Sequence, residues 1–65
     1  MLNIILKELR KKKKISQKEL SEILGIAQTT YAGYETGRHQ PNLEILIKLS
    51  EFYSVSLDYI TGRYK

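Results

Sequence analysis

The sequence has no cysteine, a single proline (Pro41) and a single histidine (His39) among its 65 residues. The absence of cysteine excludes disulfides, thiol nucleophiles and zinc sites built on thiolates. One histidine is too few for the usual His-containing metal sites. With no Gly-rich phosphate loop either, the chain offers no catalytic constellation. We therefore predict a protein that is not an enzyme and that needs neither a metal nor another cofactor.

Long apolar runs are also lacking. No run approaches the length of about 18 residues that a membrane span needs, and Asn3 and Lys7 interrupt the apolar N-terminal segment before it could act as a signal peptide. Hydrophobic residues make up 42% of the chain and charged residues 28%, as in a foldable soluble protein. A chain this short buries one core. We expect residues 1–65 to form a single cytoplasmic domain that does not bind membranes.

Positive charge is concentrated near the N-terminus. Residues 1–18 hold seven basic side chains and one acidic, a local charge of +6, whereas residues 19–65 hold four basic and six acidic, a charge of −2. A basic pole on a small domain attracts polyanions such as nucleic acid or an anionic membrane surface. The alternative is a solvated helix end, because lysines there complement the helix dipole.

Apolar periodicity and capping signals predict five short helices and no strands. Leu2, Ile5, Leu6 and Leu9 repeat with helical spacing, and Ser16-Gln17-Lys18-Glu19 has the form of a capping box. Gly25 supplies a left-handed helix end. The predicted helices cover residues of about 2–13, 17–24, 28–35, 42–53 and 56–61, which defines an all-α fold.

The second and third helices form a candidate helix-turn-helix, joined by a three-residue turn around Gly25. Gln28 opens the outward face of the helix over 28–35, where a glutamine side chain can bond adenine bidentately in the major groove. Thr29 adds a hydroxyl and a methyl group. Gly33 costs that helix about 1 kcal/mol relative to alanine, which indicates either that a close approach matters at this position or that the helix simply tolerates the glycine.

An ordered set of short segments over nearly the whole chain resembles the lambda-repressor-like helix-turn-helix domains of the Cro/C1 and XRE type. The segments are Leu9-Arg10, Ser16-Gln17-Lys18-Glu19-Leu20, Gly25-Ile26-Ala27-Gln28, Tyr34-Glu35-Thr36-Gly37-Arg38, Pro41 and Val55-Ser56-Leu57-Asp58-Tyr59-Ile60. The resemblance implies a compact five-helix domain that binds double-stranded DNA, usually as a dimer on two half-sites. The helix over 28–35 would be its recognition helix.

The resemblance also implies roles for individual residues. The base-reading set would be Gln28, Thr29, Ala32 and Gly33, and a structural ion pair would join Arg10 to Glu35. Together with the basic patch it predicts phosphate contacts by Gln17, Lys13, Lys14, Lys18, Arg38 and His39. Two alternatives stay open here: Lys11–Lys14 either contact phosphates or only steer DNA, and His39 is either a contact or an ordinary loop residue.

Two positions depart from the family pattern. Ser21 stands where alanine is preferred at the crossing of the second and third helices, and it is small enough to fit. Tyr31 replaces the usual isoleucine or valine, so its ring must pack and its hydroxyl must find a partner. Ile45 and Phe52 belong either to the margin of the core or to a dimer seam.

The function predicted from these features is that of a sequence-specific DNA-binding transcriptional regulator. We expect a repressor that binds an inverted-repeat operator as a homodimer, with no small-molecule effector. It would be bacterial or phage-encoded, and nucleoid-associated when bound to DNA. The alternatives are the antitoxin of a toxin–antitoxin pair, a protein-interaction module that uses Ile45, Phe52 and the last helix, or membrane-surface association through the basic first helix.

Overall fold

Five helices account for most of the chain in the computed structural model, which describes residues 2–62. They are α1 (Leu2–Lys13), α2 (Gln17–Leu24), α3 (Gln28–Thr36), α4 (Leu43–Tyr53) and α5 (Leu57–Thr61). No strand occurs within these residues. The predicted all-α, five-helix architecture is confirmed.

Side-chain caps determine where the helices begin. Ser16 Oγ accepts a hydrogen bond from the Glu19 amide at 3.0 Å, and Glu19 Oε1 accepts one from the Ser16 amide at 2.9 Å, which completes the predicted capping box. Asn42 and Ser56 cap α4 and α5 in extended conformations. The predicted helices over 42–53 and 56–61 therefore began one residue too early, because the cap residue itself lies outside the helix.

The turn between α2 and α3 depends on Gly25, which adopts a left-handed φ of 74°. Its amide bonds the Glu22 carbonyl at 3.2 Å, and the Ile26 amide bonds the Ser21 carbonyl at 3.0 Å. A glycine is suited to this backbone because it has no Cβ to strain. Ser21 is buried at the crossing, and its hydroxyl donates to the Lys18 carbonyl at 2.8 Å, so this departure from alanine leaves no unsatisfied polar group.

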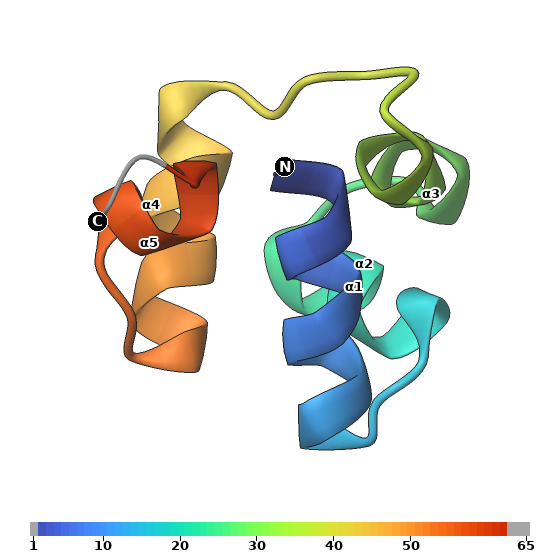
Figure 1. Ribbon diagram of the computed structural model, residues 1–65. Helices are drawn as coiled ribbons and strands as arrows, with labels where there is room; N and C mark the ends of the chain where they lie inside the picture. Colours follow the sequence, from blue (N-terminus) through green and yellow to red (C-terminus); the bar gives the residue numbers. More distant parts are fainter. Residues whose placement is uncertain (1, 63–65) are drawn as a thin grey trace.

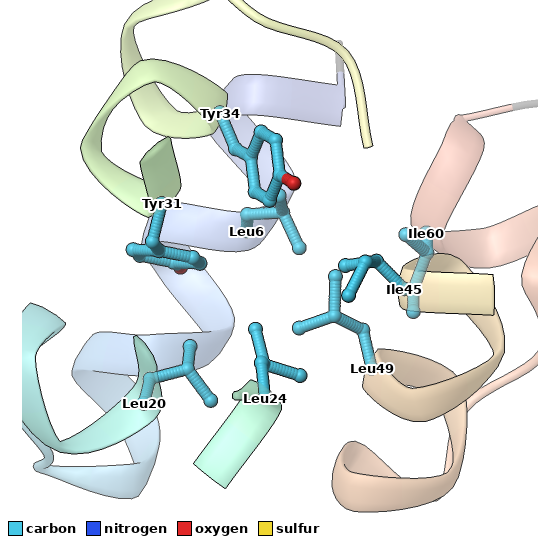
Figure 2. Close-up of a cluster of buried hydrophobic side chains, with 8 residues drawn as sticks. All are labelled: Leu6, Leu20, Leu24, Tyr31, Tyr34, Ile45, Leu49 and Ile60. Atoms are coloured by element: carbon cyan, nitrogen blue, oxygen red, sulfur yellow. The ribbon is translucent and has the colours of Figure 1, made fainter. Parts of the chain in front are cut away.

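The core draws at least one side chain from every helix. Figure 2 shows that Leu24 of α2 and Leu49 of α4 point toward each other, between the side chains of α1 and α3 and those of α5. Both leucines are at most 2% exposed. The buried cluster consists of Leu6, Leu20, Leu24, Tyr31, Tyr34, Ile45, Leu49 and Ile60. Ile45 is thus a core residue, and Phe52 packs half-buried at its edge.

Helix α1 lies centrally. It contacts α3 on one side and α5 on the other, while α2 contacts both α3 and α4. Figure 1 shows α4 and α5 on one side of α1, and α3 on the opposite side. A long connection runs from α3 to α4 past the start of α1. This arrangement leaves α3 at an outer edge of the domain. Within residues 2–62 no helix is both long and apolar enough to cross a membrane.

Candidate nucleic-acid interface

The outer face of α3 presents polar side chains at its first turn. Gln28 and Thr29 are exposed, and the first turn carries no acidic residue. Ala32 is half-buried and Gly33 is buried. A shallow hollow on this face is lined by Thr29, Ala32, Gly33, Thr36 and Arg38. Three of the four residues predicted to read bases therefore line one concave surface, and Gln28 stands exposed at the start of the same helix.

An ion pair fixes α3 to α1. Arg10 Nε lies 2.7 Å from Glu35 Oε2, and Arg10 Nη2 lies 3.2 Å from Glu35 Oε1. The guanidinium also donates to the Ile15 carbonyl at 3.0 Å through Nη1. This two-point contact matches the planar fork of arginine to a carboxylate and restricts the direction of both side chains.

Two further donors satisfy the same carboxylate. The Tyr31 hydroxyl donates to Glu35 Oε2 at 2.6 Å, and Gln17 Nε2 donates to Glu35 Oε1 at 3.0 Å. The tyrosine that replaces the usual aliphatic residue thus has the hydrogen-bond partner that its burial requires. Glu35 therefore links α1, α2 and α3 through one side chain, and we name Arg10, Gln17, Tyr31 and Glu35 the Glu35 network.

The network shifts the acid–base equilibria of its members. Burial alone would raise the pKa of Glu35, but hydrogen bonds from Arg10, Tyr31 and Gln17 outweigh it and lower the pKa below its ordinary value. The hydrogen bond to Glu35 raises the pKa of Arg10. Burial, reinforced by the hydrogen bond to Glu35, raises the pKa of Tyr31. Glu35 is thus held ionised inside the domain.

The side chain of Gln17 is held in place by a hydrogen bond and is not a freely moving surface amide. Its side chain is half-buried, and one N–H group is directed at Glu35. An amide NH₂ group has two donors, so a phosphate contact by Gln17 would use the second donor while the first keeps the side chain in place. This bond could not be predicted from local spacing, because residues 17 and 35 are brought together only by the packing of α2 against α3.

The basic residues predicted to contact phosphates come from several parts of the fold. Lys13 at the end of α1 lies with its ammonium 5.3 Å from the centroid of the Phe52 ring, on the α4 side of the domain. Lys14 and Lys18 are exposed. Arg38, which lines the hollow on α3, is exposed next to the candidate reading face. In Figure 1 the C-terminal end of α1 lies apart from α3.

Two features of the structure had no strong sequence signal. The Tyr53 hydroxyl is buried without a hydrogen-bond partner among the described residues, and burial raises its pKa to about 12. His39 packs directly on Gly33, and a Cβ on Gly33 would lie 2.9 Å from His39 Cγ. The glycine within a helical segment indicated a close approach, but not which residue makes it.

The family of this chain follows from its similarity to known proteins. Residues 6–60 match the model of a helix-turn-helix family. The chain therefore belongs to this family, in its XRE type, as the resemblance implied.

Named relatives and a solved structure agree with this assignment. AnsR, an HTH-type transcriptional regulator of Bacillus subtilis, is 47% identical over 60 residues, which are 92% of this chain and 52% of AnsR. The transcriptional repressor RstR of the cryptic phage CTXphi from Vibrio cholerae is 33% identical over 57 residues, or 88% of this chain and 51% of RstR. This chain thus spans about half the length of these relatives.

Among solved structures, a transcriptional regulator from Listeria innocua superimposes with a TM-score of 0.95 at 26% identity, covering 100% of this chain and 61% of that one.

Proposed function

We propose that the chain is a sequence-specific DNA-binding transcriptional regulator that acts as a repressor in a bacterial cytoplasm. The observation that carries the proposal is the exposed Gln28–Thr29 face of α3, held at the edge of a helix-turn-helix by the Glu35 network. Relatives named as transcriptional regulators support it, and the name of RstR supports repression.

In the proposed mechanism, α3 enters the major groove and the regulator occludes a promoter. Gln28 bonds the exposed edge of an adenine through its amide, and Thr29 adds a hydroxyl and a methyl contact. Phosphate contacts fix the register of the helix on the duplex without reading sequence. Their proposed donors are Gln17, Lys13, Lys14, Lys18 and Arg38.

A second copy of the chain is the proposed partner, because exposed leucines line an open groove of mixed polar and apolar character between α4, α5 and the start of α1. Leu43 is 64% exposed and Leu57 is 36% exposed. Both line this groove together with the apolar Leu2, Pro41 and Leu46 and the polar Gln40, Asp58 and Thr61. Exposed large apolar side chains gathered on one surface are typical of an interface. A twofold dimer through this surface would place two copies of α3 on an inverted repeat, one half-site each.

The experiment that tests the function is selection of bound DNA from a random duplex library near physiological salt. The proposal predicts an enriched inverted repeat whose half-sites lie about one helical turn apart. Enrichment of a single half-site would contradict dimeric binding. Enrichment of no sequence by a protein with an intact helical circular dichroism spectrum would contradict the proposed function as a whole.

A further inference from the structure

His39 has an unusual position relative to the candidate reading face. Although it follows α3 in the chain, its imidazole lies against Gly33 in the second turn of that helix. A Cβ built on Gly33 would lie 2.9 Å from His39 Cγ and 3.2 Å from His39 Nε2, and closer still to Cδ2. The ring therefore occupies the space in which a side chain at position 33 would begin.

The backbone holds the ring in this place. The His39 amide donates to the Gly33 carbonyl at 3.1 Å, and the Thr36 hydroxyl donates to the same carbonyl at 3.2 Å. Gly37 adopts a left-handed φ of 83°, which turns the chain back along α3 after Thr36. The main chain of His39 is thus bonded to Gly33, the same residue that its ring covers, and His39 remains exposed.

Position 33 is one helical turn from Thr29, since residues four apart lie above one another on the same helix face. Glycine has no side chain with which to contact a base at that level. The imidazole stands there instead, and it offers an N–H donor on a ring that is already oriented. In the major groove, purine N7 and guanine O6 are acceptors that such a donor can reach.

We propose, on the basis of the function proposed above, that His39 is a specificity-determining residue and not the phosphate contact that the resemblance implied. Its imidazole replaces the missing side chain of position 33 and contacts a purine edge in each half-site. Gly33 is required because any Cβ would displace the ring. The reading face then consists of Gln28 and Thr29 in the first turn of α3 and of His39 over the second turn.

The test compares four variants with the parent in the random-library selection: His39→Ala, Gly33→Ala, the double variant and, as a control, Glu51→Gln at an exposed position of α4 outside the reading face and the proposed dimer groove. His39→Ala should lose the preference at one base pair of each half-site and bind the selected site about tenfold more weakly. Its affinity for unrelated duplexes should change by less than about twofold, because base contacts carry the preference. Glu51→Gln should leave both properties unchanged.

The variants at position 33 test the placement of the ring. Gly33→Ala should remove the same preference as His39→Ala, and the double variant should lose no more than either single variant. Thermal melting supplies a readout independent of DNA. Alanine has a higher helix propensity than glycine, so Gly33→Ala should raise the melting temperature in the His39→Ala background. When His39 is present, the same substitution should raise the melting temperature less or lower it, because the new Cβ displaces the ring.

Three results would overturn the inference while leaving DNA binding by the parent intact. The first is an unchanged base preference in His39→Ala. The second is an equal loss of affinity for all duplexes in His39→Ala, which would make His39 a phosphate contact. The third is a loss of preference in the double variant that equals the sum of the losses in the two single variants. If the parent itself selects no sequence, the proposed function fails first, and the inference fails with it.

Discussion

Arg10 of α1 and Glu35 of α3 are 25 residues apart in sequence and form a two-point ion pair, with Arg10 Nε 2.7 Å from Glu35 Oε2. Their side chains are 14% and 3% exposed, so neither charge is well solvated. The same carboxylate also accepts hydrogen bonds from Gln17 and Tyr31. Arg10 is the residue of α1 in this network, so the orientation of the candidate recognition helix against α1 depends on it. We therefore propose that Arg10 acts as a structural residue and not as a DNA contact.

Replacing Arg10 should weaken folding before it weakens DNA binding. Arg10→Met leaves the Glu35 charge buried without its ion partner, which we expect to lower the free energy of unfolding by about 3 kcal/mol. Urea titration followed by circular dichroism measures the change. The control is Lys11→Met at the exposed neighbouring position, where we expect a change within about 0.5 kcal/mol. An Arg10→Met protein that melts like the parent but no longer binds DNA would contradict this assignment.

The hydroxyl of Tyr31 should contribute measurably to stability. Tyr31→Phe removes a donor to an ionised, buried carboxylate, and hydrogen bonds to charged groups are worth about 1.5 to 3 kcal/mol. We expect a loss in this range, determined by the same titration. Tyr34→Phe is the matched control. Tyr34 lies on the same helix, and its ring packs edge to face on that of Tyr31 with 5.9 Å between the ring centroids. Its hydroxyl makes no hydrogen bond to a described residue. Equal effects of the two substitutions would show that the bond to Glu35 adds nothing.

Acid should destabilise the domain through Glu35. Its pKa is lowered in the folded state from an ordinary value of 4.5, so the unfolded chain binds the proton more readily. The stabilisation is complete above pH 4.5, declines as the pH falls below this value, and is lost once the pH passes the lower folded pKa. Melting temperatures measured between pH 7 and pH 2 should show this decline. In Glu35→Gln, the decline should be shallower, and an identical pH profile would exclude Glu35 as the titrating group.

The affinity for DNA should fall steeply with salt. If each protomer of a dimer makes about four phosphate contacts, log K falls with log salt at a slope of roughly −7. Fluorescence anisotropy at several salt concentrations gives the slope. Lys18→Ala should make the slope shallower by about 2 for the dimer and weaken all sequences alike, whereas Lys7→Ala, outside the proposed contact set, should leave the slope unchanged. Identical slopes for the parent and Lys18→Ala would remove Lys18 from that set.

Local features of the sequence predicted the bounds of the helices closely. The contacts that were not predicted join residues far apart in the sequence. Ser16, Gly25 and Asn42 act within a few residues of themselves, so their capping and turn roles could be recognised from spacing. The bond between Gln17 and Glu35 and the packing of Lys13 on Phe52 join residues 18 and 39 positions apart. Such contacts depend on how the helices cross, which the apolar pattern alone does not specify.

The resemblance to a family supplied what periodicity could not, namely the pairing of Arg10 with Glu35 and the face of α3 that would meet DNA. It gave no account of the site at Gly33, where this chain lacks a side chain and His39 lies in its place. A glycine inside a helix predicted a close contact, and only the structure identifies the contacting residue.

The central claim is that α3 reads base pairs, and the affinity of Gln28→Ala for two duplexes tests it most directly. One duplex carries the site recovered by selection, and the other has the same composition in shuffled order. The account predicts that Gln28→Ala loses about 1 to 3 kcal/mol on the selected site and little on the shuffled one, since the lost contact is to a base edge. An equal loss on both duplexes, with the fold intact, would contradict the claim that this helix reads sequence.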